Sequence, residues 1–335
     1  MRFVILGTGY IGPVNTKALM ACEGAEIVGV ANRTAAKAEA MCRELGLSCP
    51  VFTDWKEALE KTGPDAAVIC VFNDQHKEYF LECARRHIHV LMEKPFANTY
   101  EDCVEMMEAA RANGIRVSVL QTQRYGAVLS TVKKYQREHR EELGRLCHVT
   151  DEISCNYFWE GRNPWHLDDV RSGGGIVLNY GVHQLDRVRF LMEQPTAAFH
   201  AHYLKEKEGI GTCSSYTMMG TAVDGASYVI TCAGYSGPSV NEIKLYYQKK
   251  TILARLAGSG AGDRGVFAGD TASGIFEPVP LCCEDGDGGH EMYVREMRAA
   301  AEYLEGRCEE PPVSMEWGAE MVRLCCLGFE EGRKN

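Results

Sequence analysis

Three segments of the sequence carry residues whose types and spacing suit chemistry on a bound small molecule. The first is the run Gly7–Gly12, which reads Gly-Thr-Gly-Tyr-Ile-Gly. The second is Met92–Pro95, in which a carboxylate and an amine precede a proline. The third is Gly173–Asp186, which begins with three glycines and continues to an amide, a histidine and an aspartate. What each segment can do depends on the elements that position it.

The glycine run at the start of the chain follows an apolar strand pattern directly and opens a helical pattern, which is typical of a dinucleotide-binding βαβ unit. The first glycine permits a tight turn, the second lets the backbone approach a pyrophosphate, and the third lets helix and strand pack closely. The N–H groups at the helix start then hold the phosphates. A plain glycine turn is the alternative. The predicted cofactor contacts are Gly7, Thr8, Gly9, Tyr10, Ile11 and Gly12.

The end of the second predicted strand bears on the choice between NAD and NADP. An NAD site places Asp or Glu there to bind the ribose 2′-hydroxyl. This chain has Asn32, Arg33 and Thr34 instead. No carboxylate is present to repel a 2′-phosphate, and the arginine fork suits one, although an exposed arginine at a strand end is also common. We predict NADP(H) as the preferred cofactor and NAD(H) as the alternative.

Lys94 lies just past a predicted strand, His89–Met92. Ligands of open α/β sheets bind at the carboxyl ends of the strands. A lysine at that point can donate to a substrate hydroxyl and stabilise a developing alkoxide. A solvated lysine before a proline turn is the alternative interpretation.

The residues after the three glycines form a polar stripe if they are helical. Asn179, His183 and Asp186 then fall at i, i+4 and i+7 on one face. The histidine could take the proton of a hydroxyl, because imidazole titrates near neutrality. Asp186 could orient that ring or pair with Arg187 or Arg189. A satisfied helix histidine is the alternative.

Residues 1–120 alternate strand and helix patterns, which predicts right-handed βαβ units and a doubly wound parallel sheet. We therefore predict a Rossmann domain over residues 1–121. The predicted strands are Phe3–Leu6, Ile27–Ala31, Ala67–Phe72, His89–Met92 and Arg116–Leu120. The predicted helices are Ile11–Cys22, Ala35–Leu45, Asp54–Glu60, His76–Arg86 and Tyr100–Ala112.

The pattern changes beyond about Gln121. Strand-like runs with partial alternation predict a large, mostly antiparallel sheet with one open face, within an α+β domain over residues 122–335. The predicted strands are Ala198–Leu204, Cys213–Ala222, Ala226–Ala233 and Glu242–Leu256. The predicted helices are Ile176–Met192, Glu291–Leu304 and Met315–Phe329, and Gly258–Gly265 is expected to be a loop.

Composition narrows the class of protein. The 335 residues suit two domains, and 45% hydrophobic with 24% charged residues is typical of a globular enzyme. A formal net charge of −10 disfavours nucleic-acid binding. No apolar run approaches the roughly 18 residues of a membrane helix, so no membrane partner is expected. The apolar start of the chain is too short for a signal peptide and is expected to be the first strand.

The cysteines and acidic residues predict no metal site. The 15 cysteines include no C-x-x-C pair. Five of them lie in apolar segments and are expected to be buried small hydrophobic residues in a reducing cytoplasm: Cys22, Cys42, Cys70, Cys83 and Cys103. Asp285, Asp287 and Glu296 have part of a calcium-loop spacing, but His290 stands where that loop needs glycine.

Taken together, these motifs resemble the glucose–fructose oxidoreductase / inositol dehydrogenase / rhizopine-catabolism (Gfo/Idh/MocA) family over nearly the whole chain. The matching segments are Gly7–Gly12, Phe72–His76, Glu93–Pro95, Gly173–Gly175, Gly181 with His183 and Asp186, Arg295–Glu296, and Pro312–Ser314. The resemblance implies a dehydrogenase or reductase that moves a hydride between a nicotinamide and a hydroxyl or carbonyl of a sugar, polyol or sugar derivative. It implies Lys94 and His183 as catalytic residues. Further cofactor contacts are implied at Phe72, Asn73, His76, Glu93, Lys94 and Pro95.

One position departs from the family pattern. Many members have an aspartate where this chain has Asn179, and an amide cannot act as a general base, although it can bind substrate hydroxyls. Asn179 is therefore expected to orient the substrate beside His183. Other substrate contacts are predicted at Gln123, Arg124, Tyr125, Trp165 and His166, with Trp165 alternatively a core residue.

Two other functions remain open at this point. A glycosidase of the same family would oxidise and re-reduce its sugar on a tightly held nicotinamide, with no net redox change. A non-catalytic NADP-binding regulator is the third candidate. In each case the resemblance implies a homodimer or homotetramer that forms through the open sheet face.

Overall fold

The computed structural model describes residues 1–205, 211–235, 238–256, 264–270 and 272–331. The chain forms two compact units: Met1–Thr122 with Gly286–Val322, and Gln123–Asp285 with Arg323–Asn335. The predicted second domain, 122–335, is thus interrupted, because residues 286–322 return to the first unit. In the described residues, no helix is both long enough and apolar enough to cross a bilayer.

The first unit is built on a six-stranded parallel sheet with the strand order β3-β2-β1-β4-β5-β6. This is the doubly wound order of a Rossmann fold, which confirms the predicted class. The strands are β1 (Arg2–Leu6), β2 (Glu26–Ala31), β3 (Val51–Phe52), β4 (Ala66–Ile69), β5 (His89–Met92) and β6 (Val117–Val119). The helices between them are α1 (Ile11–Met20), α2 (Ala35–Leu45), α3 (Trp55–Thr62), α4 (His76–Arg85) and α5 (Tyr100–Asn113).

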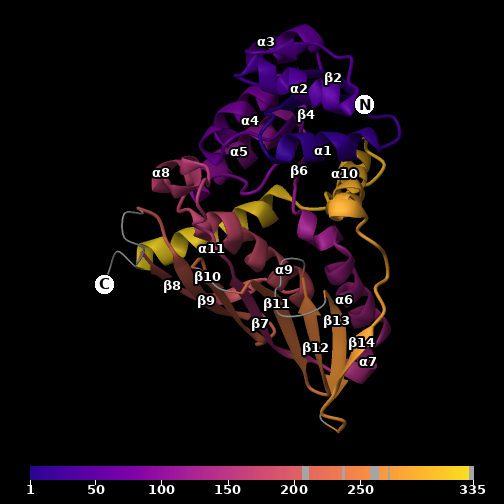
Figure 1. Ribbon diagram of the computed structural model, residues 1–335, viewed down its shortest axis with the longest axis vertical. Helices are drawn as coiled ribbons and strands as arrows, with labels where there is room; N and C mark the ends of the chain where they lie inside the picture. The colour runs from indigo at the N-terminus through magenta and orange to yellow at the C-terminus, as the bar shows by residue number, and fades with distance from the viewer. Residues whose placement is uncertain (206–210, 236–237, 257–263, 271, 332–335) are drawn as a thin grey trace. The chain divides into compact units, whose positions relative to one another are not determined.

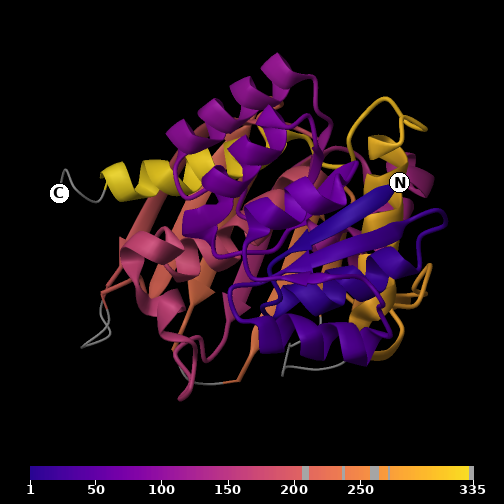
Figure 2. The same cartoon turned by 90° about the horizontal axis from the view of Figure 1, so that it is seen from above.

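A helix from late in the chain completes this unit. α10 (His290–Leu304) packs beside α1, as Figures 1 and 2 both show. Its buried residues Val294, Met297 and Leu304 join the same core cluster as Phe3 and Ile5 of β1. This apolar contact is why the segment belongs to the first unit and not to the second.

The second unit contains an eight-stranded sheet with the order β14-β13-β12-β11-β7-β10-β9-β8, in which only the β7–β10 pair is parallel. Its strands are β7 (Leu146–Ser154), β8 (Thr196–Leu204), β9 (Ser215–Ala222), β10 (Ser227–Ala233), β11 (Val240–Tyr247), β12 (Lys250–Arg255), β13 (Gly265–Asp270) and β14 (Phe276–Val279). Its helices are α6 (Ala127–Glu138), α7 (Arg140–Leu143), α8 (Asp169–Ser172), α9 (Val182–Met192) and the end of α11 (Met315–Glu331).

One sequence prediction for this unit is corrected, and another falls largely outside the described residues. The run Glu242–Leu256, predicted as one strand, is a hairpin of β11 and β12 that turns at residues 248–249. The predicted loop Gly258–Gly265 lies outside the described residues up to residue 263, and Gly265 is the first residue of β13.

The sheet of the second unit has one covered face and one open face. α6 packs on β12 and β13, and α9 packs on β7 and β10, on the same side of the sheet (Figure 1). Side chains alternate accordingly: Tyr228, Ile230 and Cys232 of β10 are buried, while their neighbours along the strand are partly exposed. This alternation is the one that the sequence predicts for an open-faced sheet.

A buried polar network fixes α9 against the covered face. The Arg187 guanidinium is fully buried and binds both carboxylate oxygens of Asp151 on β7. The same guanidinium donates to the Asn241 side chain at 2.7 Å. Gln184, one turn earlier, donates to Asp151 at 2.5 Å and accepts from the Tyr216 hydroxyl. These bonds set the rotation of α9, and with it the direction of the side chains on its other faces.

Removing one partner of this network should destabilise the protein strongly. Arg187→Met leaves the Asp151 carboxylate buried without its counter-charge, and such losses cost about 3–5 kcal/mol. We expect a lower urea midpoint by circular dichroism. The double variant Asp151→Leu/Arg187→Met should recover part of the loss, whereas Lys250→Gln, at a partly exposed ion pair, should cost under about 1 kcal/mol. An equal drop in the urea midpoint for Arg187→Met and Lys250→Gln would contradict the stabilising role of the buried Arg187–Asp151 pair.

Candidate active site

The glycine turn after β1 is shaped by contact with the neighbouring strand. Gly7 has a positive φ of 102°, and a Cβ there would lie 2.4 Å from the Cys70 carbonyl oxygen after β4. A Cβ on Gly12 would lie 2.4 Å from the Gly7 carbonyl oxygen. A Cβ on Gly9, in contrast, would meet nothing within 4 Å. The first and third glycines are therefore required by packing, and the second leaves open space, as a pyrophosphate requires.

The start of α1 suits an anionic group. The helix has no side-chain cap at Tyr10 and no acidic residue in its first turn, so its N–H groups and positive dipole end are not neutralised. Tyr10 is 94% exposed. The Thr8 N–H donates to the Asn32 side chain at 3.4 Å, which ties the glycine turn to the end of β2. The predicted residues therefore fit the diphosphate of a dinucleotide.

The end of β2 also lacks negative charge. Arg33 and Thr34 are exposed, and the Arg33 guanidinium lies over the Phe72 ring at 5.8 Å. Thr34 precedes α2, which has neither a side-chain cap nor an acidic residue in its first turn. No carboxylate in the described chain forms an ion pair with Arg33. An arginine, a hydroxyl and an uncapped helix start are thus available to an added phosphate.

Buried polar contacts tie together the loops that follow β1, β4 and β5. Asn15 of α1 is fully buried and donates to the Glu93 carboxylate at 2.6 Å and to the Cys70 sulfur at 3.5 Å. Burial raises the pKa of Glu93, and the Asn15 bond and the Lys94 charge oppose that rise. The Glu93 carboxylate also accepts the Lys94 backbone N–H at 3.2 Å. Lys94 itself is half-buried at the carboxyl edge of the sheet, where a ligand of this fold binds.

His76 connects two of these loops and does not face outward. Its Nδ1 lies 2.9 Å from the Pro95 carbonyl oxygen and its Nε2 lies 3.3 Å from that of Val71. Burial lowers its pKa to about 4, so the ring is neutral at neutral pH. His76 thus positions Pro95, which follows a cis peptide bond, and the half-buried Phe72 and Asn73 nearby. Its predicted direct contact with the cofactor stays a prediction.

In the second unit, the predicted polar stripe on α9 is broken by a π-helical turn. Residues Val177–Gly181 form that turn, and α9 follows from Val182. Asn179 and His183 are half-buried, but Asp186 is 1% exposed. Asn179 lies in the wider turn, whereas His183 and Asp186 lie three residues apart in the regular helix, so the turn changes the phase of Asn179 relative to the other two. π-turns of this kind are frequent at functional sites.

Close packing within the protein accounts for the glycines around this turn. A Cβ on Gly174 would lie 2.2 Å from the Phe329 ring, and one on Gly175 would lie 2.0 Å from the Thr212 hydroxyl oxygen. A Cβ on Gly181 would lie 2.9 Å from the end of the Met218 side chain.

Asp186 and Arg124 form a buried ion pair with each other. The Arg124 Nε lies 3.0 Å from each Asp186 carboxylate oxygen, and the guanidinium stacks on Phe190 at 5.2 Å. Arg124 is 8% exposed and fixes α9 through this pair, and its predicted contact with a substrate stays a prediction. Its neighbours Gln123 and Tyr125 are half-buried, and Gln123 accepts from Arg187 at 3.5 Å.

Asn179 belongs to an aromatic cluster. Its amide donates to the Tyr157 hydroxyl at 3.2 Å, and the Tyr157 ring packs edge-on against Tyr180 at 5.4 Å and His166 at 6.4 Å. Trp165 and His166 are both half-buried, with ring centroids 4.5 Å apart, so Trp165 is not a plain core residue. The second unit thus brings together Asn179, Trp165 and His166 from the sequence prediction.

Three residues of these clusters were not predicted. Asn15 has a sequence signal, because it is a polar residue on the inner face of α1. Tyr157 and Arg162 lie in an irregular segment after β7, where no periodicity marks them.

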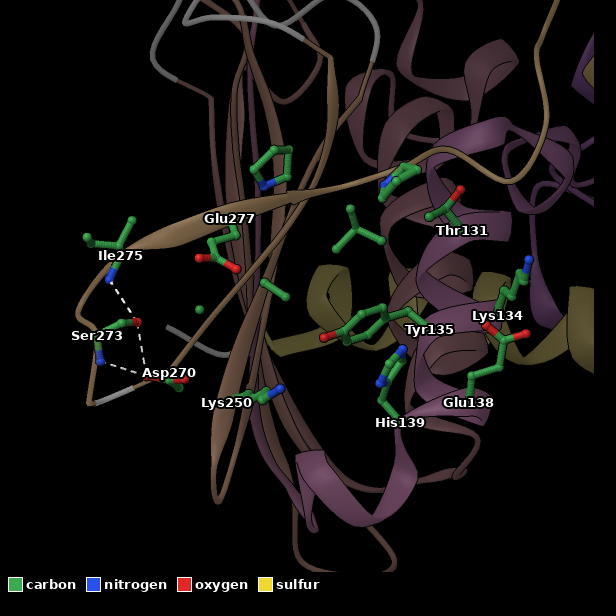
Figure 3. A pocket seen from close by; sticks show the side chains of 15 residues that line it. Thr131, Lys134, Tyr135, Glu138, His139, Lys250, Asp270, Ser273, Ile275 and Glu277 are labelled. Carbon is green, nitrogen blue, oxygen red and sulfur yellow. Dashed lines mark hydrogen bonds between the residues drawn. The ribbon is translucent and has the colours of Figure 1, made fainter.

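A pocket of about 470 Å³ lies elsewhere in the second unit, between α6 and the strands β12–β14 (Figure 3). Tyr135 and His139 stack on its helix side with ring centroids 4.1 Å apart. Lys250 faces them and binds Glu142 at 2.9 Å. None of the predicted site residues lines this pocket, and both signs of charge do, so we assign it no ligand.

Family models match both units. Residues 1–121 match the model described as an oxidoreductase family with an NAD-binding Rossmann fold. Residues 135–253 match the model of the GFO/IDH/MocA C-terminal domain. Between them, the two models match more than half of the chain.

Individual proteins are also similar. A 1,5-anhydro-D-fructose reductase from Ensifer adhaerens is 28% identical over 196 residues, 58% of this chain and 58% of that protein. A 2,7-anhydro-N-acetylneuraminate hydratase from Mediterraneibacter gnavus is 28% identical over 193 residues, 57% of this chain and 49% of that protein. The match spans only about half the length of these curated relatives. A levoglucosan dehydrogenase structure, in complex with NADH and levoglucosan, has a TM-score of 0.86 at 17% identity and covers 100% of this chain and 97% of that one, which establishes the shared fold.

Acid should destabilise the protein through His76. The folded ring has a pKa of about 4, against 6.5 as the ordinary value, so below pH 6.5 the unfolded state binds more protons. Stability from the buried neutral ring is complete above pH 6.5 and falls as the pH drops toward 4, by on the order of 3 kcal/mol. His76→Gln should lose less stability in that window, measured by urea midpoints at several pH values. Parallel pH profiles for the two proteins would refute this role.

Proposed function

The chain belongs to the GFO/IDH/MocA oxidoreductase family, and on that premise we propose that it is an NAD(P)-dependent dehydrogenase or reductase acting on a hydroxyl or carbonyl of a sugar, polyol or sugar derivative. The observation that carries this proposal is the carboxyl edge of the parallel sheet. There, an open glycine turn leads into an uncapped helix start, and the neighbouring loops hold Lys94 on a buried Asn15–Glu93 contact. Such an edge binds a dinucleotide and presents a cation to its substrate.

Residues of both units have separate roles in this proposal. Gly7–Gly12 and the start of α1 hold the diphosphate, and the bound nicotinamide supplies the hydride chemistry. Lys94 donates to the reacting oxygen and stabilises its negative charge as the C–H bond breaks. His183 takes the hydroxyl proton, or returns it in the reverse direction. Asn179 holds a neighbouring hydroxyl, since an amide can both donate and accept but cannot act as a base.

NADP(H) is the preferred cofactor in this proposal. The end of β2 offers Arg33, the Thr34 hydroxyl and the uncapped start of α2, and no acid that would repel a 2′-phosphate. NAD(H) binding needs none of these groups and is retained as the alternative.

A reaction without net redox change is the second candidate. It is favoured by one observation: a relative of 28% identity is named as a hydratase. In such a reaction the nicotinamide would stay bound and return to its starting state. Absorbance at the nicotinamide band, followed with NADP⁺ and NAD⁺ across sugars, inositols and sugar acids, separates the two. Net dehydrogenase activity gives a rising signal, whereas a redox-neutral enzyme converts its substrate with no such change.

The open sheet face supports a homodimer or homotetramer. Met219 of β9 is 48% exposed and Tyr246 of β11 is 36% exposed, on the side opposite α6 and α9. A second copy of the chain would cover these apolar side chains.

The 15 cysteines are free thiols, which is consistent with the reducing cytoplasm that we propose as the location.

Replacing the site lysine should abolish turnover without preventing cofactor binding. In Lys94→Ala the developing oxyanion loses its cation, and kcat should fall at least 100-fold. Calorimetry should give an unchanged Kd for NADP⁺. Lys61→Ala, at an exposed lysine of the same unit, is the matched control. Near-normal kcat in Lys94→Ala would disprove the role, and loss of cofactor binding would make Lys94 a cofactor residue instead.

Arg33→Ala should change cofactor preference. Loss of charge-assisted hydrogen bonds to a 2′-phosphate costs about 1.5–3 kcal/mol, which corresponds to an increase of about 10- to 100-fold in KM for NADP⁺. KM for NAD⁺ should stay within about twofold. Steady-state kinetics with both cofactors provide the measurement, and a parallel rise in both KM values would exclude recognition of the 2′-phosphate by Arg33.

A further inference from the structure

Arg162 places a cation beside the amide that we assign to substrate binding. Its guanidinium carbon lies 3.6 Å from the centroid of the Tyr157 ring. The hydroxyl of that same ring accepts a hydrogen bond from Asn179 at 3.2 Å. The positive charge and the Asn179 amide are therefore separated by about the width of one aromatic ring, within one unit of the protein.

Within the part of the chain that the structure describes, no carboxylate forms an ion pair with Arg162, and its Nε is buried without a hydrogen-bond partner. Two buried arginines of the same unit differ, since Arg124 binds Asp186 and Arg187 binds Asp151. A half-buried cation without a counter-charge is costly, and such a cost is common where a ligand supplies the missing charge.

The groups around Arg162 do not neutralise it. Burial raises the pKa values of Tyr157, Cys155 and Tyr180, and the Arg162 charge only partly opposes each rise. All three side chains are therefore neutral at neutral pH. The counter-charge has to come from outside this cluster.

Contact with a well-held ring restrains the Arg162 guanidinium. The Tyr157 ring is 1% exposed and is held by Tyr180 and Asn179. A guanidinium carries its N–H donors in a planar fork, which suits the two oxygens of a carboxylate or phosphate.

We propose that Arg162 is a specificity-determining residue that binds an anionic group of the substrate, a carboxylate or a phosphate, while Asn179 binds a hydroxyl close to it. The substrate is then an acidic sugar or a sugar phosphate and not a neutral sugar. This inference rests on the function proposed above, because it takes the Asn179 cluster as the substrate site.

The test compares three sugars that differ in one group: glucose, glucuronate and glucose 6-phosphate. Wild-type protein should show a higher kcat/KM for one of the two anions than for glucose. In Arg162→Gln the ratio of kcat/KM for that anion over glucose should fall about 10- to 100-fold, with most of the change in KM. Arg162→Lys should retain part of the ratio, because it keeps the charge but loses the planar fork. Arg140→Gln, at an exposed arginine of α7, should leave the ratio unchanged.

The two anions distinguish the source of the charge, since a preference for glucuronate indicates a carboxylate and one for glucose 6-phosphate a phosphate. A loss of kcat/KM in Arg162→Gln that is equal for the anion and for glucose would overturn the proposal and leave Arg162 a packing residue. So would a wild-type protein that prefers glucose.

Equilibrium binding separates this inference from the proposed function. Calorimetry with each sugar and NADP⁺ present needs no turnover. If the wild type binds an anion more tightly than glucose and Arg162→Gln does not, the inference stands even where no sugar is oxidised, and only the proposed redox activity fails. If neither anion binds more tightly than glucose, Arg162 does not recognise an anion.

Discussion

The site in the first unit depends on a close approach of two backbone segments. A side chain at the approaching positions would prevent it. At Gly7 the chain passes so close to the Cys70 carbonyl that a Cβ would lie 2.4 Å from its oxygen, and Gly12 approaches Gly7 in the same way. This contact brings the start of α1 over the ends of β1 and β4. That one approach positions the N–H groups that we propose to bind phosphate, the buried Asn15 on the same helix, and the Glu93–Lys94 loop that Asn15 holds.

In both units, buried polar groups fix the side chains that we propose to be functional. In the first unit, Asn15 and the neutral ring of His76 join loops from separate strands. In the second, Arg187 and Arg124 hold α9 through Asp151 and Asp186. A buried charge that is fully paired specifies one arrangement, because every alternative leaves a charge unsatisfied. The half-buried Asn179 and His183 are therefore carried on a rigid support.

Prediction from the sequence succeeded for segments with a long, regular pattern of apolar residues. It failed for features that depend on contacts between segments far apart in the chain. The strands around Ile5 and Val68 are continuous apolar runs, and the glycine turn follows directly from them. β3 has two residues and gives no periodic signal, and the return of α10 to the first unit depends on packing with α1. The sequence placed His76 and Arg124 at the site but could not reveal that both are buried and bonded within the protein. It gave no sign of Arg162, whose position depends on Tyr157.

The π-turn at Val177–Gly181 has an evolutionary consequence. Each residue of an α-helix adds about 100° of rotation, and a π-turn contains one residue more than the α-helical turn it replaces. Deleting a single residue from this stretch would turn Asn179 relative to His183 by about that angle while α9 stayed anchored by Arg187. An ancestral gene could thus have acquired or lost a substrate through a one-codon insertion or deletion, with every side chain of the pocket conserved.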